Sequence, residues 1–381
     1  MCVAVLCSLS ARREADVWRS DWIAREQTPQ RLRAALVYAP GDATKWRELG
    51  VLLLRKGMDS KPAFERALDL NRFESDALLG LAIDAESHGF GSAAESSYIQ
   101  AIGVSRCFRP KYALAAFYAR AGRREDFWRI AAAAANIDQA DIGPVERLAR
   151  DAGADPDEIP TLLHLNTEHA LSAYLTIALS QNRPKPLAEV ALRLPATRAR
   201  QPALLEACGR LIEAGTTEAA VAVWNHVGIF QKLDPAAGRS LTNTAFSYSA
   251  VRGFNWRSNE LTGVQIRAAS TGLRIELTGE QPEHALLLEQ IVPVLARRKY
   301  RFSVRSGAPE ASTQAGIAWQ IQCAASPEII ASGFPASTTL NFTTPAGCTL
   351  IRASLVYNRQ LGTVRIATTF DLLSAELELL R

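Results

Sequence analysis

Histidine residues are the first candidates for metal chemistry in this sequence of 381 residues. His164 and His169 lie five positions apart, with Glu168 directly before the second. A zinc site on one helix face uses histidines four positions apart, as in the HExxH arrangement. A separation of five turns the two imidazole rings to different faces of a helix, so we expect no bound metal.

Gly89 and Gly91 imitate part of a glycine-rich dinucleotide-binding loop. Such a loop follows a strand and opens a helix, whose N-terminus then holds the phosphate groups. Residues 84–88 have the pattern of a helix instead, so we interpret the two glycines as a turn between helices. The sequence therefore predicts no cofactor.

Acidic residues offer no clear catalytic pair. A glycosidase needs two carboxylates that face one cleft, and the glutamates of the C-terminal part show no such pairing: Glu276, Glu280, Glu283 and Glu289. The sequence also lacks a Gly-x-Ser-x-Gly nucleophile motif. We therefore predict that the protein is not an enzyme, and a carbohydrate-active enzyme is the least favoured of three hypotheses.

Tryptophan residues in polar surroundings suggest sugar binding. An exposed indole ring can stack on the apolar face of a sugar, while amides and guanidinium groups hydrogen-bond its hydroxyls. The candidates for glycan binding are Trp256, Asn255, Arg257 and Trp319. The alternative for both indoles is the hydrophobic core, since tryptophan is highly buried on average.

Two cysteines fall in strand-like segments of the C-terminal part. Cys323 ends one such segment and Cys348 begins another. One interpretation is a disulfide between neighbouring strands. The other is a pair of buried thiols, since a free cysteine packs as a small hydrophobic residue.

The elements that must position these residues change in type along the chain. From Trp18 to about Leu233 the apolar residues have helical spacing and alanine is abundant, which favours helix. From about Leu241 the apolar residues alternate with polar ones, as in 273–277 and 317–321, and glycine or proline turns separate the segments. This pattern predicts an antiparallel β-sandwich or barrel. We place the linker at 234–240.

The helical part contains a repeat. The positions of Trp46, Leu49, Gly50 and Leu53 recur about 32 residues later as Leu78, Leu81, Ala82 and Ala85, and again 33 residues on as Lys111, Leu114, Ala115 and Tyr118. This pattern resembles the tetratricopeptide repeat, a helix–turn–helix unit of 34 residues. The resemblance predicts a solenoid over 28–233 with a protein partner on its concave face.

Composition and charge exclude other classes. The apolar fraction of 48% and the charged fraction of 22% are those of a folded globular protein. A net charge of +4 gives no reason to expect nucleic acid as a partner. Residues 1–27 allow two interpretations: a shortened signal or membrane anchor, because Met1–Ala11 is mostly apolar, or a first helix.

The C-terminal half also carries a set of short sequence motifs that resemble those of one family. They are Ser240–Asn243, Gly253–Arg257, Gly279–Glu283, Glu289–Pro293, Arg298–Tyr300, Gly316–Trp319 and Leu355–Arg359. The chain resembles tetratricopeptide-repeat proteins of acidobacteria and related bacteria that are encoded among exopolysaccharide or exosortase-type genes. The resemblance implies a galactose-binding-like jelly roll over 241–381. Asn255 stands where these proteins usually have aspartate.

The resemblance implies a scaffold or binding protein in the production or export of cell-envelope polysaccharide. The helical repeats would then bind a protein, and the sandwich would bind glycan. The alternative is a pure protein scaffold whose sandwich is a structural cap. We expect a periplasmic or membrane-associated protein if a longer N-terminal segment anchors it, and a cytoplasmic one if the short N-terminus is genuine.

Overall fold

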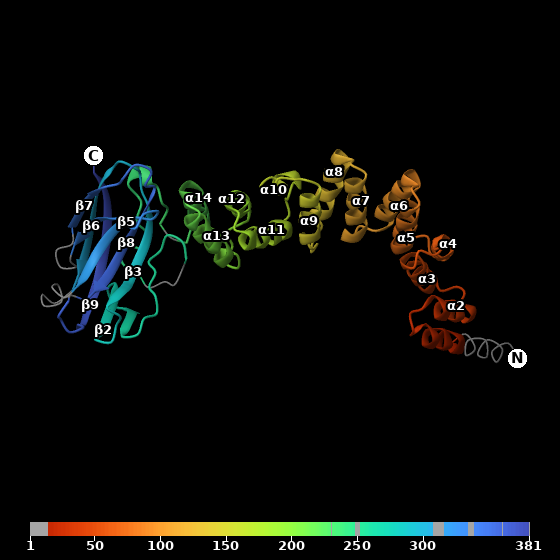
Figure 1. Ribbon diagram of the computed structural model, residues 1–381, viewed down its shortest axis with the longest axis horizontal. Helices are drawn as coiled ribbons and strands as arrows, with labels where there is room; N and C mark the ends of the chain where they lie inside the picture. The colour runs from red at the N-terminus through yellow and green to blue at the C-terminus, as the bar shows by residue number, and fades with distance from the viewer. Residues whose placement is uncertain are drawn as a thin grey trace. The chain divides into compact units, whose positions relative to one another are not determined.

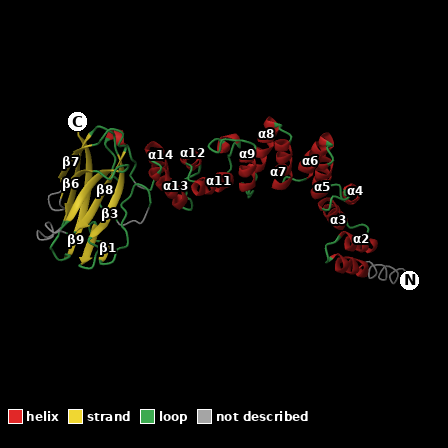
Figure 2. Cartoon of the chain, in the orientation of Figure 1, coloured by secondary structure: helices red, strands yellow, loops and turns green. Residues whose placement is uncertain are grey.

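The computed structural model describes residues 14–229, 231–247, 252–307, 316–333, 339–359 and 361–380. Helices occupy the described residues up to Val227, and antiparallel strands follow from Val264 to Leu380 (Figures 1 and 2). The fold class predicted from the sequence is thereby confirmed. The chain forms two compact units, Met1–Ala173 and Tyr174–Arg381, whose boundary falls inside helix α11.

The first unit is an array of helical hairpins. Residues 14–24 are helical, and the helices that follow are α2 (Pro29–Tyr38), α3 (Ala43–Arg55), α4 (Lys61–Leu70), α5 (Ser75–Ser87), α6 (Gly91–Val104), α7 (Phe108–Arg120), α8 (Arg124–Ala135), α9 (Gly143–Asp151), α10 (Ile159–Leu162) and α11 (Glu168–Gln181). The pairs α3–α4, α5–α6 and α7–α8 keep the predicted period.

Glycines turn the chain within each of these three pairs. Gly57, Gly89 and Gly122 have φ values of 63°, 79° and 68°, in the left-handed region that only glycine enters without cost. Each lies just after the first helix of its pair. Gly89 is therefore a turn residue between α5 and α6, as the sequence predicts, and no strand precedes it in the described chain.

Small residues let neighbouring hairpins approach closely. The ring of Phe64 on α4 is fully buried and fills the space beside Gly50 of α3 and Gly80 of α5. A methyl group on Gly50 would lie 2.6 Å from Cε1 of Phe64, and one on Gly80 would lie closer still. Gly50, Leu49, Leu53, Leu78 and Ala82 are buried, while Trp46 and Leu81 are partly buried, so the repeat positions do form the helix–helix contacts.

The second unit combines three further helices with the β-sandwich. The helices are α12 (Pro184–Arg193), α13 (Gln201–Glu213) and α14 (Thr217–Val227), followed by the short 3₁₀ helix η1 (Pro235–Ala237). The described strands form two sheets. One has the order β1 (Val264–Ala268), β2 (Leu273–Thr278), β9 (Ala367–Leu380), β4 (Lys299–Ser306), β7 (Thr339–Thr343), and the other the order β3 (His284–Pro293), β8 (Leu350–Asn358), β5 (Ile317–Cys323), β6 (Ile329–Gly333).

The sandwich core lies between the inward faces of the two sheets. Ile275 of β2, Phe302 of β4 and Phe370 of β9 come from one sheet, and Trp319 of β5 and Leu355 of β8 from the other. All are at most 2% exposed. The alternation of buried and exposed residues along β2 and β4 is the period of two read from the sequence.

The last helical hairpin packs directly on a sandwich loop. Phe254 meets Trp224 of α14 edge to face at 5.9 Å between ring centroids. Gly253 has a φ of 96°, and a side chain there would collide with the indole of Trp224 and approach the thiol of Cys208 on α13. Helices α13 and α14 and the sandwich are therefore one packed body.

We predict that Gly50→Ala and Gly80→Ala each destabilise the first unit by about 1–3 kcal/mol, because the added methyl group overpacks the Phe64 site. Gly103→Ala on α6 is the matched control. An added methyl group there meets no atom within 4 Å, and alanine favours helix over glycine by about 0.8–1 kcal/mol. Urea unfolding measures the differences, and equal stability of all three variants would contradict the packing described.

Candidate functional site

The helical repeats of the first unit contain a groove between α5 and α7. A hollow of about 640 Å³ is lined by Ile83, Glu86, Ser87, Tyr98, Arg109, Tyr112, Ala113, Ala116 and Arg120. Ile83 is 44% exposed although it is aliphatic. The floor is thus apolar, and its alanines leave room for a side chain from outside.

Ion pairs fix the polar rim of this groove. Arg120 donates from Nε and Nη2 to the two carboxylate oxygens of Glu86, at 2.8 and 2.9 Å. These bonds, opposed in part by desolvation, hold the pKa of Glu86 below its usual range. The Tyr98 hydroxyl donates to the same carboxylate at 2.9 Å, and burial is the main cause that raises the pKa of Tyr98.

A second ion pair continues the rim. Arg109 donates to Asp76 at 2.9 Å, and Arg47 of α3 approaches the other oxygen of Asp76 at 3.4 Å. The basic side chains on this surface are therefore each paired with an acidic one. Such a groove suits an apolar side chain of a polypeptide whose backbone reaches the polar rim.

The predicted glycan residues of the sandwich are mostly interior. Trp319 is fully buried, with its ring centroid 5.3 Å from that of Phe302 and 5.7 Å from that of Trp256. A ring without exposed surface has no face for a sugar, so the sandwich core is the correct interpretation for Trp319.

Trp256 and Asn255 are also packed inside. Trp256 is 5% exposed, its ring lies 4.9 Å from that of Phe246, and its indole N–H donates to the carbonyl oxygen of Asn243 at 3.1 Å. Asn255 is fully buried and accepts a hydrogen bond from the Asn243 side chain at 3.0 Å. The sugar-stacking role predicted for Trp256 is therefore wrong, because neighbouring side chains cover the faces of its ring.

Arg257 alone among the four candidates reaches the surface. Its side chain is 41% exposed and lies 3.3 Å from Glu289 of β3. It borders a cleft of about 580 Å³ whose polar lining includes Ser258, Asn259 and Glu260 of the sandwich and Glu213 of α13. The edge of Trp256 and the side chains of Phe246 and Leu288 form apolar parts of its wall.

Ser258, Asn259 and Glu260 line the cleft but are not among the residues predicted from the sequence. The sequence does contain a signal for them, because Arg257–Glu260 is an unbroken polar run directly after the aromatic segment Phe254–Trp256. Hydroxyl, amide and carboxylate groups in a cleft with an apolar wall have the chemistry that carbohydrate hydroxyls and C–H faces require.

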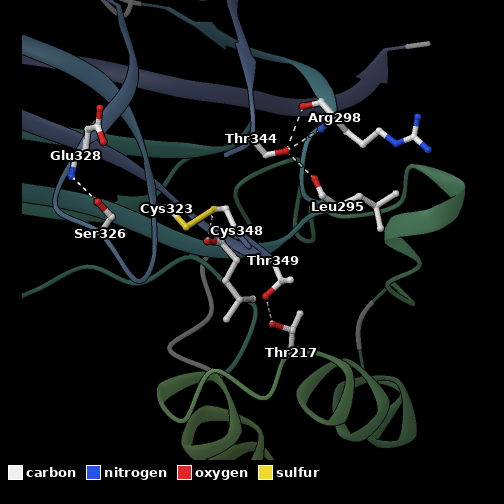
Figure 3. The surroundings of a disulfide bond; sticks show 10 residues. Thr217, Leu295, Arg298, Cys323, Ser326, Glu328, Thr344, Cys348 and Thr349 are labelled. Carbon is white, nitrogen blue, oxygen red and sulfur yellow. Dashed lines mark hydrogen bonds between the residues drawn. A yellow bond between two sulfur atoms is a disulfide. The ribbon is translucent and has the colours of Figure 1, made fainter. Parts of the chain in front are cut away.

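Cys323 and Cys348 form a disulfide in the structure, with 5.8 Å between their Cα atoms (Figure 3). Cys323 is the last residue of β5, and Cys348 precedes β8 and is 1% exposed. Next to this bond, the hydroxyls of Thr349 and of Thr217 at the start of α14 hydrogen-bond at 2.8 Å. The disulfide therefore lies beside a contact between the sandwich and α14.

The described residues contain no cluster of three or more His, Cys, Asp or Glu side chains that could hold a metal ion. His169 contacts the carbonyl oxygen of Ala140 at 2.9 Å. None of the described helices is long and apolar enough to cross a bilayer. The apolar stretch Met1–Ala11 lies outside the described residues.

Comparisons with known proteins identify no family. No family model matches the chain, and no curated protein matches it. Among solved structures, the chain is similar to one titled "Functional Characterization of Pseudomonas Aeruginosa pilF". The two are 16% identical over 49% of this chain and 75% of that chain, with a TM-score of 0.25.

We predict that Trp256→Ala destabilises the second unit by about 3–5 kcal/mol, the usual cost of truncating a buried tryptophan. Arg257→Ala, one residue along the same loop, is the control and should change stability by less than about 1 kcal/mol. Urea unfolding followed by near-UV circular dichroism measures both. A Trp256→Ala variant as stable as the wild type would place the ring at the surface.

We also predict that replacing Cys323 and Cys348 together by serine lowers the free energy of unfolding by about 2–4 kcal/mol, because the bond closes a loop spanning 25 residues. Mass spectrometry of non-reduced peptides should find the two cysteines linked. Free thiols at both positions in protein purified under oxidising conditions would contradict the bond.

Proposed function

We propose that this chain is a non-enzymatic interaction scaffold whose helical repeats hold a protein partner. The groove between α5 and α7 carries the proposal: it has an exposed aliphatic floor at Ile83 and a rim fixed by the pairs Arg120–Glu86 and Arg109–Asp76. A partner segment that places one apolar side chain on this floor removes Ile83 and Tyr112 from water, which is favourable by about 25 cal/mol per Å² of apolar surface.

The partner's backbone completes the contact. Charged rim residues that already pair with each other attract no strongly charged ligand, so a segment of balanced charge suits the groove better than an acidic or basic tail. The exposed edges of Arg109 and Arg120 can donate hydrogen bonds to its carbonyl groups, while Glu86 accepts from its N–H groups.

Ile83→Asp tests this proposal, because a carboxylate on the floor must lose its hydration when an apolar side chain docks. The wild-type chain is used to isolate partners from its own cells, and each partner is then titrated against the variants. We expect binding to weaken at least tenfold, or by about 1.4 kcal/mol, in Ile83→Asp. Ile99→Asp on α6, where the isoleucine is 51% exposed outside the groove, should bind normally. Equal binding by both variants would exclude the groove.

We further propose that the sandwich binds glycan in the cleft beside Trp256, within a role in cell-envelope polysaccharide production or export. The support is the polar lining of Arg257, Ser258 and Asn259 against an apolar wall. The competing proposal is a pure protein scaffold, in which the sandwich caps the helices. Binding of polysaccharide by the full chain decides between them.

We expect glycan binding in the millimolar to micromolar range, or about 4–8 kcal/mol, when the full chain is screened against a bacterial polysaccharide array. Asn259→Ala should reduce it by removing an amide from the cleft without touching the core. Arg305→Ala on β4 is the control, since Arg305 does not line the cleft. The absence of binding at millimolar ligand would favour the scaffold with a structural cap.

A location in the cell envelope, periplasmic or attached to the membrane, completes the proposal. The disulfide supports it, because such bonds persist in oxidising compartments and are rare in the cytosol. Fractionation of the source cells, followed by non-reducing peptide mapping, tests it. A cytosolic protein with both cysteines reduced would contradict the proposed location.

A further inference from the structure

Strand β9 is longer than its neighbour β2, and its last residues have an open edge. On one side β9 pairs with β4 as far as Leu380. On the other side β2 pairs with it only up to Leu372, and no described strand continues that pairing. The backbone N–H of Ala375 donates on this second side to the carbonyl oxygen of Thr244 in a loop, at 2.8 Å.

The backbone groups of Leu377 and Leu379 face this open edge. Successive residues of a strand direct their N–H and C=O groups to opposite sides. Since Ala375 bonds away from β4, Leu377 and Leu379 also face away from β4. Their N–H and C=O groups make no hydrogen bond with another described residue on that side. Such a row of unpaired groups is a template for a further strand.

A hollow of about 790 Å³ lies along the open edge. Its walls include residues 376–380 of β9 and residues 236–241, which begin in η1. Figure 2 shows the short helix η1 at the end of the sandwich where the chain ends. The five residues 376–380 span about 17 Å at the rise of a β-strand. The hollow therefore borders enough edge for a short extended segment.

A buried polar group in the wall of the hollow also lacks a partner. Ser240 lines the hollow and is 2% exposed, and its hydroxyl makes no hydrogen bond with another described residue. Its backbone groups likewise bond to no other described backbone group. A buried hydroxyl without a partner lowers stability. The backbone of a segment bound in the hollow can supply the hydrogen bond.

The side chains of β9 define what an added strand must carry. Leu377 and Leu379 face inward and pack against the sandwich core. Glu376 and Glu378 alternate with them and are exposed. Residues directly opposite each other in paired strands share one face of the sheet. Apolar residues of an added strand therefore belong opposite Leu377 and Leu379, and polar ones opposite the two glutamates.

The free charges of the hollow differ between its two ends. Glu378 and Arg239 are already engaged in ion pairs of 3.1 and 2.8 Å. Glu376, at one end, and Arg298, at the other, line the hollow without an ion pair to another described residue. Arg298 lies at the Leu380 end, because the residue after it is opposite Leu380. A complementary segment is therefore basic at one end and acidic at the other.

We propose that the open edge of β9 binds an extended segment of a partner protein as an additional strand, antiparallel to β9 as β2 and β4 are. The segment places apolar residues opposite Leu377 and Leu379. Its N-terminal end carries an acidic residue beside Arg298, and its C-terminal end carries a basic residue opposite Glu376. A second copy of β9 does not suit the edge, because antiparallel pairing centred on Leu377 or Glu378 sets glutamate opposite glutamate.

A synthetic peptide tests the proposal on the full chain. The probe has the order glutamate, valine, threonine, valine, lysine, with both ends blocked. We expect it to bind with a dissociation constant below about 1 mM. The peptide of reversed order has the same composition, and we expect it to bind more weakly on the order of tenfold, because like charges then meet. Absence of binding by the probe, or equal binding by both peptides, would overturn the proposal.

Two changes separate strand addition from attraction between charges. Methylation of both valine nitrogens removes the N–H groups that bond to Leu377 and Leu379, so binding of that peptide should be lost. Glu376→Lys should weaken binding of the unmodified probe on the order of tenfold. Glu328→Lys is the matched control, since Glu328 is exposed outside the hollow, and it should bind normally. Unchanged binding after methylation, or in Glu376→Lys, would contradict the added strand.

Amide hydrogen exchange measured by NMR locates the bound peptide. On binding, we expect exchange at the N–H groups of Leu377 and Leu379 to slow on the order of tenfold. Exchange at Glu376 and Glu378, whose N–H groups face β4, should change less. A peptide that binds without protecting Leu377 and Leu379 would occupy another surface, and the proposal would fail.

Discussion

A helical hairpin cannot bury its own apolar face, so the hairpins of the first unit must pack closely against one another. Phe64 of α4 is the clearest case, since its ring occupies space left free by a glycine on α3 and a glycine on α5. The two hairpins can approach closely here because one side is large and the other is bare, a constraint that Gly50 and Gly80 satisfy together.

The same constraint operates in the second unit between a helix and a loop. Gly253 leaves room for Trp224, and Phe254 packs against the same indole. Buried polar groups then hold the loop on the sheet. The side-chain amide of Gln290 on β3 donates to the carbonyl oxygen of Phe254 at 2.7 Å and to the hydroxyl of Thr242 at 2.8 Å. Both the cleft beside Trp256 and the contact with Trp224 of α14 depend on this loop.

Periodicity made most of the fold predictable, because a period is a local property of the chain. The positions of Gly57, Gly89 and Gly122 mark three hairpin turns, and alternation marks strands such as β2 and β4. The surroundings of Trp256 are not local: Phe246 and Trp319, which cover its ring, come from ten residues before it and from β5. The sequence around Trp256, a glycine and polar residues, therefore left both a surface and a core position open for its ring.

The pairing of Cys323 with Cys348 was open for a related reason. It depends on where β5 ends relative to the start of β8, and this register is fixed by partners such as Trp319 with Leu355 and Cys323 with Ile351. The contact of Thr349 with Thr217 had no sequence signal at all. The two threonines are 132 residues apart, so their contact depends on the packing of α14 against the sandwich and not on any local sequence pattern.

The contact of Gly253 and Phe254 with Trp224 affects how this protein can be divided by recombination. A fragment that starts at residue 241, where the strand pattern begins, leaves Phe254 without its aromatic neighbour and exposes the loop that Gln290 holds. A fragment that ends at 233 leaves Trp224 uncovered in turn. A recombinant fragment should therefore keep the sandwich together with α13 and α14, because a cut placed only at the change of secondary structure separates residues that pack as one body.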